Sequence, residues 1–217
     1  MTTLQTFFYN LLSFTEALSA IIGVAYYSKL KNTYWKWFVA YLIFIAAAEL
    51  FSKYGLRFFP EMRKVYYDFL IIPIQFFFFY WLYAYKSLKR AHLFWSLCAV
   101  YLLTFSLTHF FDIDKTRIIN MITYSVGTLQ LLVLVILEFF KQIKSDTILK
   151  FFNVKMFYVN FGVALFYIGT LPFFAFDGFA VEHTKEIWNN YWTVFLVLNN
   201  VLYLIFTASF IWGKPHL

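Results

Sequence analysis

Long apolar stretches alternate with short polar connections along the whole chain. A membrane-spanning helix needs about 20 mostly apolar residues, and seven stretches of the 217-residue sequence meet this requirement. The connections carry most of the charged residues and are too short to form a soluble domain. The pattern therefore predicts an all-α fold, with one transmembrane bundle over residues 1–217. The expected spans are about 7–27, 35–52, 65–85, 92–111, 118–140, 156–176 and 191–212.

Composition supports a membrane protein. Hydrophobic residues make up 62% of the chain and charged residues only 13%, whereas a soluble domain contains about 25% charged residues. No positively charged leader followed by a small-residue cleavage site precedes the first apolar stretch, so we expect this stretch to be retained as a span. Cys98 is the single cysteine, which excludes an intrachain disulfide.

The basic residues of the connections predict the orientation of the bundle. The connections after the first, third and fifth spans, together with Lys214, contain eleven of the 18 basic residues. The other side contains seven, together with most of the acidic connection residues. Because cytoplasmic loops are enriched in Lys and Arg, we expect the N-terminus outside and the C-terminus in the cytoplasm.

The net charge of +7 is scattered over these connections rather than gathered in one patch. This arrangement favours contacts with anionic lipid head groups over nucleic-acid binding, which we exclude as a function.

Glu16 lies near the middle of the first predicted span. Ser13, Ser19, Ala20 and Gly23 follow it at helical spacing and form a small, polar stripe on a bulky helix. We expect this stripe to face the bundle. Ionisable groups inside a span are candidates for function, but a protonated Glu16 that only hydrogen-bonds a neighbouring helix is an equal alternative.

Three more ionisable residues lie near the outer ends of predicted spans: Glu49, Asp68 and His109. Gln75 follows Asp68 by one heptad, and Pro73 between them predicts a kink. No Lys or Arg falls inside the predicted spans, so neutralisation would require a proton, His109, a metal ion or a cationic ligand. Alternatively, Glu49 and Asp68 reach the wet head-group layer.

His109, Asp112 and Asp114 place one imidazole and two carboxylates at the outer mouth. These groups could hold a divalent cation. A plain acidic turn between two spans is the alternative, since the segment matches no closed set of zinc ligands.

Uncharged polar residues concentrate in the last three spans. Asn200, Tyr203 and Thr207 share a face of the last span, and Asn199 adjoins it. Hydrogen bonds between helices are the favoured explanation, with a ligand site as the alternative. Glu138 ends the fifth span beside Lys141, and we expect a solvated ion pair at the cytoplasmic interface.

Seven spans invite comparison with retinal proteins. We exclude retinal as a cofactor because neither the stretch from Tyr191 to Trp212 nor any other predicted span contains the lysine that a Schiff base needs. A closer resemblance lies in the stretches from Val65 to Lys86 and from Leu198 to Lys214. These are similar to uncharacterised small seven-helix membrane proteins of Bacteroidota. That resemblance implies a bacterial cytoplasmic membrane and no particular activity; Gln75 departs from the acidic residue usual there.

Three functional hypotheses follow. The first is a receptor or sensor that binds a small, possibly cationic ligand and signals through a membrane or cytoplasmic partner. Its outer-half pocket would be lined by Glu16, Glu49, Asp68, Gln75, His109, Trp188, Trp192, Asn199 and Asn200. The second is a proton- or cation-coupled transporter or channel using Glu16. The third, a metal-dependent lipid enzyme, is less favoured because no catalytic constellation is recognised.

Overall fold

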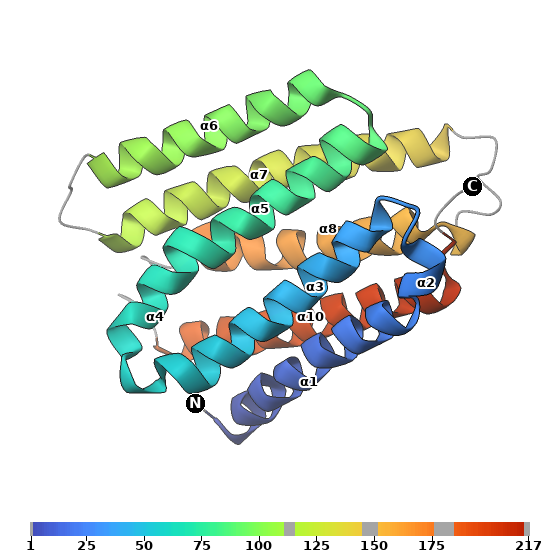
Figure 1. Cartoon of the computed structure of the whole chain (residues 1–217). Helices are drawn as coiled ribbons and strands as arrows, with labels where there is room; N and C mark the ends of the chain where they lie inside the picture. The colour runs from blue at the N-terminus through green and yellow to red at the C-terminus, as the bar shows by residue number, and fades with distance from the viewer. Residues whose placement is uncertain (1, 111–115, 145–151, 176–184, 215–217) are drawn as a thin grey trace.

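The computed structural model describes residues 2–110, 116–144, 152–175 and 185–214, and Figure 1 traces them as a bundle of helices. Within these ranges the chain is helical, apart from turns and one isolated parallel bridge between Val154 and Lys214. The main helices are α1 (Thr3–Ala25), α2 (Tyr27–Leu30), α3 (Trp35–Leu50), α4 (Pro60–Tyr66), α5 (Ile72–Tyr80), α6 (Ala91–Phe110), α7 (Thr116–Ile143), α8 (Lys155–Ala175) and α10 (Lys185–Trp212).

Six helical stretches of the described chain are long and apolar enough to cross a membrane, which makes this a multi-pass membrane protein by length and composition. They are Thr3–Ala25, Trp35–Phe58, Glu61–Ser87, Ala91–Thr108, Ile122–Ile143 and Asn189–Trp212. The remaining predicted span, 156–176, corresponds to α8. That helix is not one of the six, so the seven-span count and the orientation stay predictions.

The helices at the second and third predicted spans extend beyond the predicted span bounds. After α3 the helix continues through a π-helical turn, η1 (Phe51–Gly55), and a 3₁₀ turn, η2 (Leu56–Phe58). Pro60 then occupies the first turn of α4, where its missing N–H costs nothing. The span ends predicted at 52 and 65 rested on Lys53 and Arg63, which look like loop residues in the sequence. In the structure both belong to the helices.

A π-helical turn stands where the sequence predicted a kink. It is η3 (Tyr67–Ile71), which joins α4 to α5 just before Pro73. A proline lacks the N–H for the preceding turn and crowds its carbonyl, which favours this widening. A further π-helical stretch, η4 (Trp81–Ser87), extends α5.

The order of helices around the bundle follows from their packing. Helix α1 packs between α3 and α10, α10 packs on α8, and α8 packs on α7, which also contacts α5 and α6 (Figure 1). Helices α3 and α5 meet through aromatic side chains, above all the stacked rings of Tyr41 and Phe78, whose centroids lie 4.1 Å apart.

The bundle has an N-terminal end and a C-terminal end. The N-terminal end holds residue 2 and the turn at residues 58–60. The C-terminal end holds the turns at residues 26–34 and 87–90 together with Lys214 (Figure 1). In the predicted orientation, these are the outer and the cytoplasmic ends.

Aromatic rings fill the core towards the C-terminal end. Phe38 of α3 is fully buried, and its ring contacts the rings of Trp35, Tyr41, Phe78, Phe206 and Phe210. A second cluster forms around Phe76 of α5. The glycine at 127 in α7 permits this packing, since a Cβ there would lie 2.8 Å from the Phe76 ring.

Candidate functional site

Glu16 lies inside the bundle, as its sequence neighbours predict. Its side chain is only 3% exposed, and Ser19, Ala20 and Gly23 on the same stripe are buried as well. The small residues allow neighbouring helices to approach α1 closely. Among the described residues, no hydrogen bond links the Glu16 carboxyl to another side chain; Ser19 donates to the Glu16 backbone carbonyl instead. Glu16 is therefore a buried residue whose carboxyl has no direct hydrogen-bond partner in the described chain.

Glu49 is an acidic group that interacts electrostatically with this carboxyl. It lies in the last turn of α3, and its charge acts on Glu16. The hydroxyl of Tyr67 in η3 donates to Oε2 of Glu49 over 2.6 Å. Arg63 of α4 acts on Glu49 electrostatically, while its Nη2 donates to the Ser52 carbonyl over 3.2 Å. The hydrogen bond from Tyr67 thus holds Glu49 in place.

Lys53 of η1 connects the site to α1 through hydrogen bonds. Its Nζ donates to Oδ1 of Asn10 over 3.1 Å and to Oγ of Ser13 over 3.2 Å, and it lies 5.0 Å from the centre of the Tyr9 ring. Its charge reaches Glu16. We call the following set the Glu16 cluster: Tyr9, Ser13, Glu16, Glu49, Lys53, Arg63 and Tyr67.

The Glu16 cluster overturns one premise of the sequence analysis. No basic residue was expected inside the spans, yet Lys53 and Arg63 belong to helical stretches that qualify as spans. Their charges act on the two carboxyl groups, Lys53 on Glu16 and Arg63 on Glu49, although neither base forms an ion pair with them in the described chain. The spacing of Glu49 and Lys53, four residues apart, was the signal in the sequence that a basic side chain lies on the same helix face as this acid. Even so, Lys53 donates to α1 rather than to Glu49.

Asp68 and Gln75 lie apart from the contacts that define the Glu16 cluster. Both are half-buried. The charge of Asp68 acts on Tyr101 of α6, on the other side of α5 from α1. The π-helical turn η3 between Asp68 and Gln75 also alters the register, so the heptad spacing no longer assigns them to one face.

Asn200 fastens α10 to α1. Its Nδ2 donates to the carbonyls of Phe8, over 3.1 Å, and Leu196, over 2.8 Å. Its Oδ1 accepts from Thr15 over 3.1 Å. Because both N–H groups and the oxygen of the amide form hydrogen bonds within the protein, Asn200 has the helix-joining role favoured from the sequence. Asn199, next to it in α10, and Trp192, about two turns earlier, are half-buried. The Trp192 ring stacks on Phe195 with 5.2 Å between the ring centres.

Some predicted site residues lie outside the part of the chain that is described. The side chains of His109 and Trp188 are among them, as are Asp112 and Asp114 entirely. Within the described residues, no three His, Cys, Asp or Glu side chains gather as metal ligands. The metal site at the outer mouth stays a prediction.

Glu138 is not the solvated residue that the sequence suggested. Its side chain is 1% exposed because α7 packs against η4 at this level. Oε2 accepts from Ser87 over 2.7 Å, and Oε1 accepts from Gln142 over 3.2 Å and lies 3.6 Å from Nζ of the more exposed Lys141. Burial and, secondarily, the charge of Glu138 raise the pKa of Tyr34, before the second span, to about 12.

Because both oxygens of Glu138 are used, we expect Glu138→Gln to lower the free energy of unfolding by about 1 to 3 kcal/mol. The amide that replaces one oxygen presents hydrogens to a donor and leaves a buried bond unmade. Unfolding in mixed micelles of dodecyl sulfate would measure the loss. An unchanged unfolding curve would contradict a structural role for Glu138.

Comparisons with known proteins add no relative. No protein-family model, no curated protein and no solved structure matches this chain.

Proposed function

We propose that this protein is a receptor-like protein of a bacterial cytoplasmic membrane, with seven spans, the N-terminus outside, and the Glu16 cluster as its ligand site. One observation carries the proposal: a carboxyl that is 3% exposed and has no direct hydrogen-bond partner in the described chain. An unpaired ionisable group inside a span is costly. Such a cost is typical of a group kept for binding rather than for stability.

The ligand we propose is a small polar molecule with both a donor and an acceptor group. A purely cationic ligand is less suitable than the sequence suggested, because two basic side chains, Lys53 and Arg63, belong to the same cluster and would repel it. The Nε atom of Arg63 is buried and lacks a hydrogen-bond partner among the described residues. A zwitterion could offer an ammonium group to Glu16 and a carboxylate to a basic residue.

Signalling would use the position of the cluster between separate helices. Its residues come from α1, the end of α3 with η1, and α4 with η3. A ligand that binds one arrangement of these helices more tightly shifts the population towards it. The described chain contains little protein beyond the helices, so we propose that a partner reads the change at the basic C-terminal end.

Proton-coupled transport through Glu16 is the second candidate, favoured by the same buried acid. Packing opposes it, because the rings of Phe38, Phe206 and Phe210 fill the core on the way to the C-terminal end. Liposomes with a pH gradient would separate the two functions. Proton flux that disappears in Glu16→Gln would favour transport, and a sealed membrane would favour the receptor.

Replacing Glu16 by glutamine tests the ligand-site proposal through stability. We expect Glu16→Gln to leave the free energy of unfolding unchanged or to raise it by about 1 kcal/mol, because the substitution removes a buried ionisable group that no described side chain hydrogen-bonds. Glu138→Gln is the matched control and should be destabilised in the same assay. If both substitutions destabilise equally, Glu16 is a structural residue and the proposal fails.

Access to the site can be tested with a carbodiimide, which modifies protonated carboxyl groups. In sealed vesicles, a water-soluble carbodiimide on the N-terminal side is expected to modify Glu16, as read by mass spectrometry. Glycine, betaine and choline serve as competitors: glycine is a zwitterion with N–H donors, betaine lacks the donors, and choline lacks the carboxylate. Protection by glycine alone supports the proposed ligand class. Protection by choline alone indicates a cationic ligand, and labelling only by a lipid-soluble carbodiimide contradicts a site open to water.

A further inference from the structure

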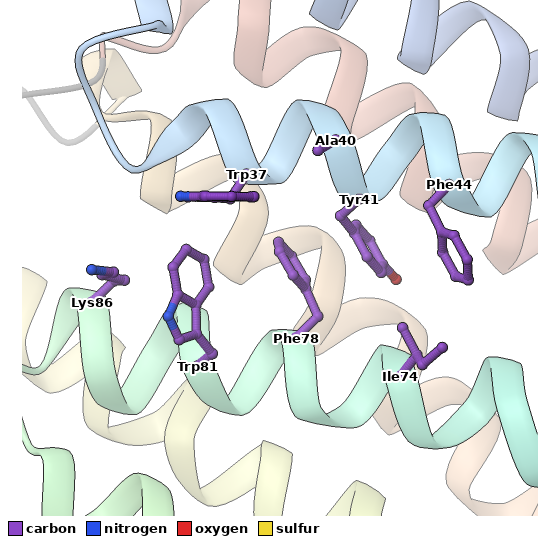
Figure 2. A pocket seen from close by; sticks show the side chains of 8 residues that line it. All are labelled: Trp37, Ala40, Tyr41, Phe44, Ile74, Phe78, Trp81 and Lys86. Carbon is purple, nitrogen blue, oxygen red and sulfur yellow. The ribbon is translucent and has the colours of Figure 1, made fainter.

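A groove runs between α3 and the helix formed by α5 and η4, away from the Glu16 cluster. It has a volume of about 540 Å³. Figure 2 shows side chains from the two helices facing each other across it. The lining residues are Trp37, Ala40, Tyr41 and Phe44 on α3, and Ile74, Phe78, Trp81 and Lys86 on the other helix.

The groove exists because one small side chain, Ala40, lies among the large side chains of its walls. Ala40 leaves space between the rings of Trp37 and Phe44, while the stacked rings of Tyr41 and Phe78 hold the two helices apart. Trp37 is 54% exposed and Phe44 38% exposed. Both helical stretches are candidate spans, so these exposed apolar surfaces face the hydrocarbon of the bilayer. The groove is therefore open to lipid along its side.

Two lysines lie near the C-terminal end of the groove. Lys86 lies in its wall, with Nζ 5.3 Å from the ring centre of Trp81 and 4.9 Å from that of Tyr85. Lys36 lies on the other side of Trp37, with Nζ 5.6 Å from that ring, in a neighbouring hollow of about 410 Å³. Contacts with the aromatic faces restrain both ammonium groups. No carboxylate lines either hollow.

The surrounding connections have the same sign of charge. Residues 26–36 and 86–90 include Lys29, Lys31, Lys36, Lys86, Lys89 and Arg90, and no acidic residue. An apolar groove that ends in a restrained lysine, at the level where a helix leaves the membrane, is complementary to a phospholipid with an anionic head group. The acyl chain would lie in the apolar groove, and the phosphate would lie beside the basic side chain at the end of the groove.

We propose that this groove is a specific site for one anionic phospholipid, with an acyl chain along Ala40, Tyr41 and Phe78 and the phosphate at Lys86. The site is independent of the function proposed for the Glu16 cluster. Its occupant differs from ordinary boundary lipid because selection depends on one named lysine, Lys86, at one position of the bundle.

Tryptophan fluorescence provides the test, since Trp37 and Trp81 line the groove. The full chain is reconstituted in phosphatidylcholine with increasing fractions of brominated phosphatidylglycerol or, in parallel, brominated phosphatidylcholine. We expect the brominated phosphatidylglycerol to quench at a lower fraction. Lys86→Gln should weaken this preference about fivefold, as expected for the loss of one basic contact near the membrane surface. Ala40→Leu, which fills the groove, should abolish it, and Trp37→Phe should remove much of the selective quenching.

Lys144→Gln is the matched control, because Lys144 is an exposed lysine at the same end of the bundle but away from the groove. It should keep the preference for phosphatidylglycerol. Equal quenching by the two brominated lipids overturns the proposal, and so does an equal loss in Lys144→Gln. Cross-linking of two copies across Trp37 would also overturn it, because a second chain would then cover the groove.

Discussion

Phe38→Ala is expected to lower the free energy of unfolding by about 3 kcal/mol or more, the range seen when a large core ring is removed. Phe38 is fully buried, and five aromatic rings surround it, the nearest that of Phe206 at 5.1 Å between centroids. Lipid tails are as apolar as the protein interior, so transfer out of water contributes little inside a membrane. The cost comes from the cavity and the lost packing, which a dodecyl sulfate titration would measure.

Phe14→Ala is the control for this prediction. The Phe14 side chain belongs to α1 and is 62% exposed, so in a bilayer it faces lipid in the folded protein and in separated helices alike. We expect its substitution to change stability by less than about 0.5 kcal/mol. Equal effects of the two substitutions would mean that the aromatic cluster does not hold α3 to α10.

Gly213→Ala is the second substitution with a large expected effect. A Cβ at this position would lie 2.5 Å from the Ser209 carbonyl oxygen and 2.6 Å from Cα of Lys155, both backbone atoms. The backbone segments that pair next to Gly213 would have to separate. Two hydrogen bonds would then break: Lys155 N donates to the Lys214 carbonyl over 3.0 Å, and Lys214 N donates to the Asn153 carbonyl over 2.7 Å. We expect a loss of about 2 to 3 kcal/mol.

This junction also contains a buried lysine. Lys155 is 1% exposed; its Nζ donates to the Ser209 carbonyl over 2.6 Å and lies 4.5 Å from the centre of the Phe210 ring. The ammonium group thereby satisfies a carbonyl in the last turn of α10. Separation of the two backbone segments that pair next to Gly213 would expose this contact, which adds to the expected loss.

Gly23→Ala is the matched control for Gly213→Ala. Its Cβ would lie 3.3 Å from the end of the Phe210 side chain, a distance that a small shift of the ring relieves. Its unfolding free energy should stay within about 1 kcal/mol of the wild type, because alanine also favours the helix. Thermal unfolding in detergent would compare the two variants. A smaller loss for Gly213→Ala than for Gly23→Ala would contradict the close approach of α8 and α10.

The sequence was most informative where a single helix contains the signal. The apolar stretches predicted the helices, and the small, polar stripe around Glu16 predicted the face of α1 that is buried. Both predictions depend on periodicity along one helix and on the cost of polar groups in hydrocarbon. Near Pro60 the helices extend further than the predicted spans, because basic residues such as Lys53 and Arg63 are usually read as the ends of spans.

The sequence by itself determined an apolar helical bundle and the burial of Glu16, since composition and helical spacing decide these locally. Only the tertiary structure decided the partners: that Lys53 donates to Asn10 and Ser13 of α1, and that Glu138 is buried against Ser87. The groove at Lys86 likewise needed the structure. Each depends on which helices pack side by side and at what register, and a pattern along one helix contains no information about its neighbour.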